Sequence, residues 1–212
     1  SYRLTQTVEY WPKDTVFVSV VDPGVGSSRK SVVARTSGGQ YIVTPNNGTL
    51  THVLKDMGIE EVRSLEEETH LRPDTEASYT FHGRDLYANV GAKLAAGVLS
   101  FEDIGNPLPL EEVVILPTTD TSFENDEVAG TVDVLDVRFG SLWTSIDRTS
   151  FQKLGINFGE KVEISIYNHT SLVYQNRILY GKSFAYVMVG EALVYVNSLY
   201  RMGIAINQGS FA

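Results

Sequence analysis

The 212-residue chain contains no cysteine, which excludes disulfides and cysteine-ligated metal sites. It also lacks long apolar runs: no stretch reaches the ~18 residues that a transmembrane helix needs. Basic residues are scarce, with 17 Lys and Arg against 26 Asp and Glu, so the formal net charge is −9. This balance argues against nucleic acid and anionic membranes as partners, because both bind basic patches. A cytoplasmic protein is expected, since a reducing compartment suits such a chain.

Hydrophobic residues make up 42% of the chain and charged residues 20%, which predicts a packed core. In the first half, short apolar strands alternate with amphipathic helices. Strands are expected at 15–21, 41–43, 61–65 and just before His82, and helices at 49–57 and 85–97. This alternation predicts an α/β domain over residues 1–117, with a mostly parallel sheet and flanking helices.

A polar, acidic stretch interrupts the pattern, and residues 118–127 are interpreted as a linker. Beyond it, short apolar segments are separated by Gly, Asn and Ser. The expected strands cover 128–146, 161–168, 171–178, 183–190, 192–198 and 202–207, with one short helix near 149–154. This spacing predicts a small antiparallel β-barrel domain over residues 128–212.

The stretch VVDPGVGSSRK places Asp22 where a buried strand must end and brings Arg29 back seven positions later. The stretch FHGRD repeats the pattern around His82. Because strand ends in a parallel sheet fall along one edge, these three side chains are expected to converge as a reaction centre. An ordinary Asp-Pro-Gly turn and a structural histidine are the competing interpretations. No spacing of His, Asp and Glu suggests a metal site.

A second informative stretch is LDVRFGSLWTSI, in which Asp136 and Phe139 flank an arginine and Trp143 follows. An aromatic face and an acid suit a flat ring that carries a cation nearby. A bulged strand with core aromatics explains the same residues equally well.

The chain resembles the S-adenosyl-L-methionine (SAM) hydrolases that form adenosine, which are relatives of bacterial fluorinase and chlorinase. The resemblance spans nearly the whole chain and rests on motifs that occur in the family's order: VVDPGVGSSRK, TPNNGTLTHVL, YTFHGRDLYA with GAKLAAG, LDVRFGSLWTSI and YVNSLYRMGIAINQGS. It implies an N-terminal α/β domain, a C-terminal β-barrel and a homotrimer. In that trimer, substrate lies between the first domain of one subunit and the second domain of its neighbour.

Carried over to this sequence, the resemblance assigns the catalytic set to Asp22, Arg29 and His82. It expects Asp136 near the methionine amino group and Ser198 at the carboxylate. The remaining residues implied at the substrate are Phe139, Ser141, Trp143, Asn207 and Gln208. Ser141 stands where the family has a longer asparagine, so adenine recognition differs there.

The implied reaction is attack of an activated water on the ribose 5′ carbon of SAM, which gives adenosine and L-methionine. A sulfonium is already a good leaving group, so no metal or cofactor is expected. Two alternatives remain: a synthase of 5′-halo-adenosine, and a non-catalytic module that binds adenosine or SAM. The family's first strand, with its Thr-Asp-Phe-Gly type of motif, has no match here. The chain is therefore expected to be truncated at both ends.

Overall fold

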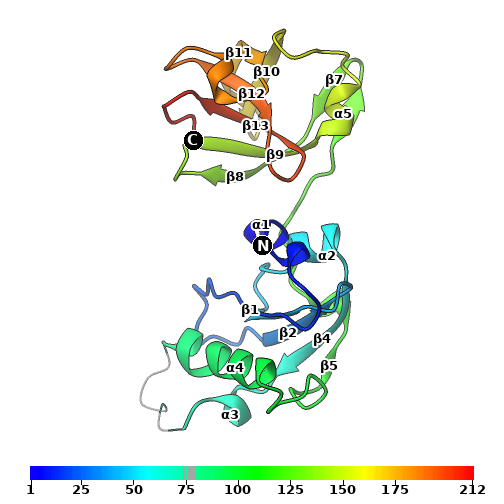
Figure 1. Ribbon diagram of the computed structural model, residues 1–212, viewed down its shortest axis with the longest axis vertical. Helices are drawn as coiled ribbons and strands as arrows, with labels where there is room; N and C mark the ends of the chain where they lie inside the picture. Colours follow the sequence, from blue (N-terminus) through cyan, green and yellow to red (C-terminus); the bar gives the residue numbers. More distant parts are fainter. Residues whose placement is uncertain (74, 76–79) are drawn as a thin grey trace. The chain divides into compact units, whose positions relative to one another are not determined.

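The computed structural model describes residues 1–73, 75 and 80–212. The chain divides into two compact units, Ser1–Leu116 and Pro117–Ala212. Each unit has its own sheet and its own hydrophobic core (Figure 1). Within the described residues, no helix is long and apolar enough to cross a membrane.

The first unit is built on a five-stranded sheet with the order β1-β3-β2-β4-β5. Only the pair β1–β3 is parallel, whereas β3–β2, β2–β4 and β4–β5 are antiparallel. The prediction of a mostly parallel sheet is therefore wrong. The strands are β1 (Val16–Val18), β2 (Ser31–Thr36), β3 (Tyr41–Pro45), β4 (Ile59–Leu65) and β5 (Pro107–Leu108).

The sheet differs from the predicted parallel one because of strand β2, for which no strand was expected. Only residues 37–40 separate β2 from β3, and Gly39 there has a φ of 82°. A connection this short can join only antiparallel strands, because parallel strands need a crossover of about a dozen residues. The hairpin therefore makes the two strands β2 and β3, at the centre of the sheet, antiparallel.

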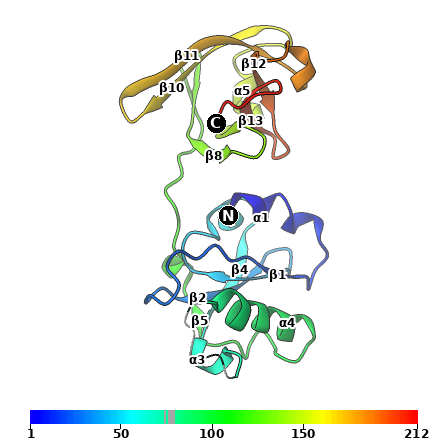
Figure 2. The ribbon, with the colours of Figure 1, turned by 90° about the vertical axis from the view of Figure 1, so that its left-hand side faces the viewer.

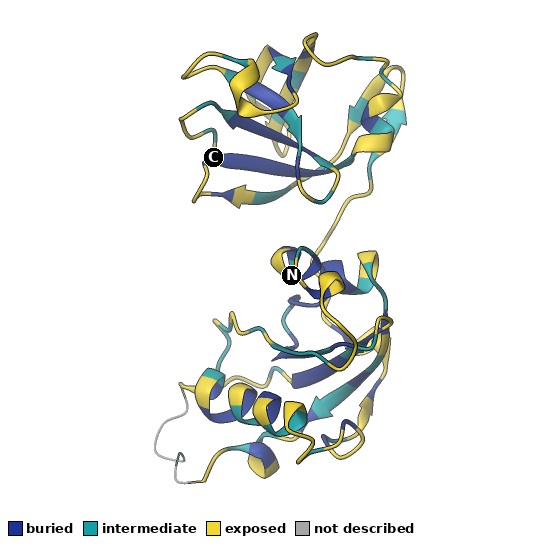
Figure 3. Cartoon of the chain, viewed as in Figure 1, coloured by how far each residue is buried: buried dark blue, intermediate teal, exposed yellow. Residues whose placement is uncertain are grey.

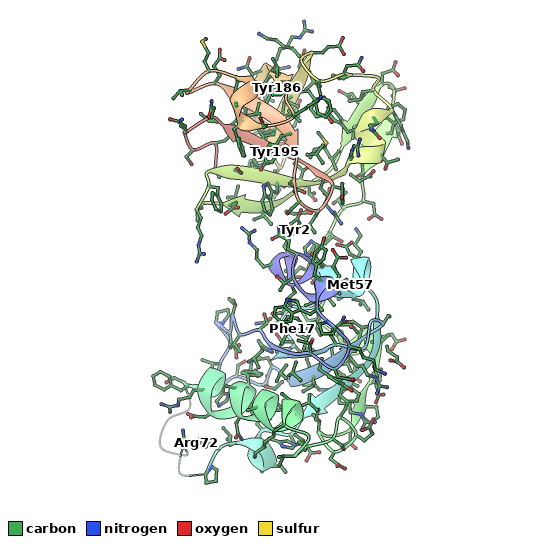
Figure 4. The ribbon with its side chains drawn as sticks, viewed as in Figure 1. Tyr2, Phe17, Met57, Arg72, Tyr186 and Tyr195 are labelled. Carbon is green, nitrogen blue, oxygen red and sulfur yellow. The ribbon has the colours of Figure 1, made fainter. Side chains whose placement is uncertain are left out.

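Both faces of this sheet are covered (Figures 1 and 2). In β2, Val32 and Ala34 belong to one core cluster and Val33 to the other, as strand periodicity requires. Phe17 and Met57 pack against the first cluster from β1 and the end of α2 (Figure 4). The first face holds α1 (Tyr2–Thr5), η1 (Val8–Tyr10) and α2 (Thr51–Asp56); the second holds the helical turn η2 (Gly83–Ala88) and α4 (Asn89–Ala95).

Two short elements flank this core, α3 (Glu67–His70) and η3 (Leu110–Glu112). The helix expected at 85–97 is present, but its beginning, η2, is a π-helical turn that runs into α4. The strand expected before His82 falls largely on positions outside the described residues. Thr80 and Phe81, which are described, are not in a strand.

The second unit contains a curled six-stranded sheet with the order β10-β11-β12-β13-β9-β8 (Figure 2). The chain also forms a separate hairpin, β6–β7, and two short helices. The elements are β6 (Ser122–Glu124), β7 (Glu127–Ala129), β8 (Val132–Asp136), β9 (Ser141–Asp147), α5 (Arg148–Gln152), β10 (Lys161–Asn168), β11 (Ser171–Tyr180), η4 (Phe184–Tyr186), β12 (Ala192–Val196) and β13 (Arg201–Ile206).

This sheet corrects the expected antiparallel barrel in two respects. The strand pairings of Pro117–Ala212 do not join β8 to β10, so the sheet is not closed, and β11 pairs with β12 in parallel. The strand expected at 183–190 is wrong, because η4 and a turn occupy it. Strand β6 lies inside the segment interpreted as a linker. Buried residues follow the strands of both sheets (Figure 3).

Replacing Ile42 by Ala tests the core of the first unit. Ile42 is in β3 and fully buried, so we expect the free energy of unfolding to fall by about 2–5 kcal/mol. Denaturant unfolding measures the loss, and Ile115→Ala is the matched control because Ile115 is 45% exposed. Equal effects of the two substitutions would contradict the assigned core.

Candidate active site

A polar cluster in the first unit begins at the loop after β1. Two consecutive turns fold this loop, with the Val25 amide donating to the Asp22 carbonyl at 3.3 Å and the Ser27 amide to the Gly24 carbonyl at 3.0 Å. The second turn includes Gly26, whose φ of 77° suits glycine. Together the turns reverse the chain and bring Arg29 back to Asp22.

Asp22 and Arg29 form a bidentate ion pair. Arg29 Nε donates to Asp22 Oδ1 at 2.9 Å, and Arg29 Nη2 donates to Asp22 Oδ2. The two side chains are 5% and 10% exposed, respectively. Burial lowers the pKa of Arg29, but hydrogen bonds to Asp22 and Glu67 outweigh it and leave that pKa above its ordinary value. The guanidinium therefore stays charged, and the pair is fixed in one geometry.

Sheet topology explains why the loop ends meet. β1 is parallel to β3, and β2 is antiparallel to β3, so the end of β1 and the start of β2 lie at the same edge. β4 is antiparallel to β2, with Leu65 opposite Ser31, so β4 also ends at this edge. Asp22 and Arg29 therefore meet as expected, but the starts of antiparallel strands form this edge as well as strand ends.

Glu67, the first residue of α3, joins the cluster and was missed by the sequence analysis. It accepts a hydrogen bond from Arg29 Nη1 at 3.0 Å and another from the Ser31 hydroxyl at 2.6 Å. The available signal was its place just after a strand, as for Asp22. Three consecutive glutamates occupy positions 66–68, so the sequence did not show which one turns inward.

His82 lies next to Glu67. Its side chain is 6% exposed, and its Nδ1 lies 3.7 Å from Glu67 Oε2. This Nδ1 is buried and has no hydrogen-bond partner among the residues that the structure describes. The π-helical turn η2 begins directly after His82, and such turns occur often at functional sites.

Ser31 and Tyr87 complete the network. The Ser31 hydroxyl lies 2.7 Å from Tyr87 Oη and also receives a hydrogen bond from Arg29 Nη1 at 2.8 Å. Because its single proton goes to Glu67, Tyr87 must be the donor to Ser31. Burial raises the pKa of Tyr87 to about 12, against opposing effects of Ser31 and Arg29. The phenol thus remains protonated, as its donor role requires.

The charges of this cluster do not cancel. Asp22 and Glu67 are carboxylates, and Arg29 is the cation that pairs with both. The formal sum is −1, which attracts cations and disfavours anions. Among the described residues, no group of three or more His, Asp or Glu side chains could hold a metal ion.

The sequence-predicted binding residues belong to the second unit. Asp136 ends β8 and pairs with Ser141, the first residue of β9; both are buried. Phe139 lies in the turn between these strands and is 76% exposed. A Cβ on Gly140 would lie 2.5 Å from Ser210 Cα, so glycine lets the C-terminal segment approach this turn.

Among the other predicted binding residues, Asn207 and Gln208 belong to the segment that reaches the β8–β9 turn, whereas Ser198 lies at the other end of β9. Asn207 and Gln208 follow β13 and begin the C-terminal segment that reaches the β8–β9 turn; Asn207 Nδ2 donates to the Val187 carbonyl at 2.8 Å. Ser198 is exposed in the β12–β13 turn, which precedes β13, whereas Asn207 and Gln208 follow β13. This turn lies near Asp147, the last residue of β9, and Ser141 is at the other end of the same strand.

Trp143 lies in the middle of β9 and is only 8% exposed. Its indole nitrogen donates to Tyr195 Oη at 2.7 Å, and a Cβ on Gly203 would lie 3.2 Å from its ring (Figure 4 labels Tyr195). Trp143 is therefore largely a core residue of this sheet, as the alternative interpretation held, with its polar atom already bonded.

Sequence models of two domains match the chain. The SAM hydroxide adenosyltransferase N-terminal domain matches residues 1–105, and the C-terminal domain of the same family matches residues 130–212. A crystal structure of an uncharacterized conserved protein from Thermotoga maritima superposes with a TM-score of 0.83 at 35% identity, covering 99% of this chain and 76% of that one.

Curated relatives carry two names. An (R)-S-adenosyl-L-methionine hydrolase from Methanocaldococcus jannaschii is 37% identical over 70% of this chain, and the match spans 48% of that protein. A Salinispora tropica protein of the same name is 32% identical over 99% of this chain and 73% of its own length. A fluorinase from Actinopolyspora mzabensis is 30% identical over 96% of this chain and 74% of its own length. The chain thus belongs to the SAM hydroxide adenosyltransferase family.

Proposed function

We propose that the protein hydrolyses SAM to adenosine and L-methionine. The observation that carries the proposal is the buried Asp22–Arg29 pair with His82 at the same sheet edge, in a chain whose relatives include named SAM hydrolases. The cluster's negative formal charge suits a sulfonium substrate, which is a cation.

The chemistry needs a water and a place for its proton. The water oxygen bonds to the ribose 5′ carbon while the bond from that carbon to sulfur breaks, and the electron pair leaves with sulfur as the thioether of methionine. His82 or Asp22 accepts the proton that the water loses. Arg29 holds the Asp22 carboxylate in place, because it donates to both carboxylate oxygens. The leaving group is good, so we propose that no cofactor takes part.

We further propose that the second unit holds the parts of SAM that do not react. Asp136, buried at the end of β8, would pair with the methionine amine, and the exposed ring of Phe139 would stack on adenine. Trp143 could offer only its ring, since its nitrogen donates to Tyr195. We propose Ser141, Asn207 and Gln208 as supporting positions because they lie toward the same end of the sheet, whereas Ser198, at the other end of β9, rests on the family resemblance alone.

A halogenase is the second candidate, because a fluorinase is among the relatives. A halide ion would have to approach a cluster whose formal charge is −1, whereas neutral water would not be repelled. The buried histidine beside the Glu67 carboxylate also suits proton removal, which a halide nucleophile does not need. These two features favour water.

Product analysis separates the candidates. We expect adenosine and methionine when the protein is incubated with SAM in chloride buffer and the products are separated by chromatography. A 5′-halo-adenosine as the product would establish the halogenase instead. Tight binding in calorimetry with no product would establish the non-catalytic module.

Removing the proton acceptors should slow the chemical step. We expect His82→Ala and Asp22→Asn each to lower kcat by ~10²–10⁴-fold, the usual contribution of a positioned acid or base, with KM little changed. The double variant should lose less than the product of the two effects, because the groups act as a unit. Steady-state kinetics measures this, with exposed His169→Asn as the control; full kcat in folded His82→Ala would refute the mechanism.

Removing the proposed amine partner should weaken binding instead. We expect Asp136→Ala to raise KM by roughly 10–100-fold, which corresponds to a hydrogen bond to a charged group, and to leave kcat nearly unchanged. Glu127→Ala is the matched control because Glu127 is an exposed acid of the same unit. A fall in kcat at constant KM would place Asp136 in the chemistry rather than in binding.

We also propose a cytoplasmic homotrimer, on the strength of the family resemblance and of the lack of cysteine. Light scattering of the purified protein at micromolar concentration is expected to give three times the 23.4 kDa chain mass. A monomeric mass would contradict the trimer.

A further inference from the structure

We propose that Glu67 is a positioning residue for this reaction. Its carboxylate fixes the proton of His82 on Nδ1, so that Nε2 is the atom that accepts a proton from water. The inference deepens the proposed hydrolase function and rests on it for the catalytic consequence, although the tautomer of His82 is a property of the protein alone.

The two oxygens of Glu67 have different partners. Oε1 accepts from Arg29 Nη1 and from the Ser31 hydroxyl, at 3.0 and 2.6 Å. These two donors fix the orientation of the carboxylate, which leaves Oε2 directed toward His82 Nδ1 at 3.7 Å. The Glu67 carboxylate therefore binds Arg29 through Oε1 and faces the His82 ring with Oε2.

The environment of His82 selects one tautomer. In a neutral imidazole one nitrogen donates and the other accepts, so a carboxylate beside Nδ1 favours the form protonated there. At 3.7 Å the contact is longer than a hydrogen bond, and a small rotation of the ring would shorten it. Catalytic hydrogen bonds are often this long before substrate binds, and they tighten in the complex.

The other charged groups around His82 are already engaged. Asp22 is paired with Arg29, and Asp85, in η2, accepts hydrogen bonds from Arg84 at 2.6 and 2.8 Å. Tyr87 donates to Ser31 and stays neutral. Glu67 is thus the carboxylate whose geometry leaves one oxygen for the ring.

The neighbouring residue provides a matched control. Glu68 follows Glu67 in α3 and is exposed, whereas the Glu67 side chain is 32% exposed. Glu68→Gln removes the same charge from the same helix without touching Arg29, Ser31 or His82. Any effect of general charge or helix content will appear in both variants, and an effect of positioning will appear only in Glu67→Gln.

Nitrogen-15 NMR of labelled histidines reads the tautomer directly. The chain has four histidines, and the His82 signals are those lost in His82→Ala. Above neutral pH we expect His82 to be protonated on Nδ1 in the wild type and in Glu68→Gln. In Glu67→Gln the form protonated on Nε2 should become populated. A wild-type His82 protonated on Nε2, or a tautomer unchanged in Glu67→Gln, would overturn the proposal.

Kinetics tests the consequence. We expect Glu67→Gln to lower kcat by roughly 10–100-fold, part of the ~10²–10⁴-fold that a positioned base supplies, with KM within about twofold of the wild type. Adding Glu67→Gln to His82→Ala should cost nothing further, and Glu67→Asp should recover part of kcat. Loss of thermal stability with kcat unchanged would make Glu67 merely structural and refute the proposal.

The two proposals fail in different ways. If the wild type releases no adenosine from SAM, the hydrolase function is refuted, and the NMR result still decides whether Glu67 sets the tautomer. If the wild type is active and the tautomer does not depend on Glu67, only the present inference is refuted. Should Glu67→Gln not fold, as judged by circular dichroism, Glu67→Asp takes its place in both experiments: it should weaken the preference for Nδ1, and an unchanged tautomer refutes the inference.

Discussion

The buried ion pair between Asp22 and Arg29 is the constraint on which the first unit's polar site depends. Removing two charges from water costs several kcal/mol per ion, and only close pairing with further hydrogen bonds offsets that cost. The loop between β1 and β2 meets this requirement by folding through two turns, so that Arg29 donates twice to Asp22. The pair fixes the guanidinium of Arg29, which then donates to Ser31 and Glu67 where the strand pairings have placed them.

A chain of hydrogen bonds spreads from this pair with each proton assigned. Arg29 donates to Ser31 and Glu67, Ser31 donates to Glu67, and Tyr87 donates to Ser31. Networks in which every member is satisfied are rigid, because changing one bond leaves a buried group unpaired. The exception is Nδ1 of His82, which is buried beside Glu67 without a hydrogen bond among the described residues. The hydrogen-bonded frame holds Glu67 so that its Oε2 faces this nitrogen, at 3.7 Å.

The second unit contributes a different kind of surface. Its sheet buries Asp136 and Ser141 at the start of a tight hairpin and exposes Phe139 at the tip. Glycine at position 140 lets the C-terminal segment pack against that hairpin, which brings Asn207 and Gln208 to the same end of the sheet. The residues proposed for the reaction and those proposed for binding therefore lie in separate units, each with its own sheet and core.

Hydrophobic periodicity and turn residues are local, so they predicted the α5 helix, most strands and the change of pattern between the two units, and they placed Asp22 and Arg29 on one turn-rich loop. The remaining features depend on strand pairings, several of them between distant parts of the chain. The antiparallel direction of the first sheet came from the short β2–β3 connection, and the open, partly parallel second sheet from pairings distant in sequence. Glu67 could not be told from Glu66 and Glu68, which share its chemistry. The pairing of β4 with β2 places α3 beside Arg29 and His82. In this position, Glu67 is the glutamate whose carboxylate points into the cluster.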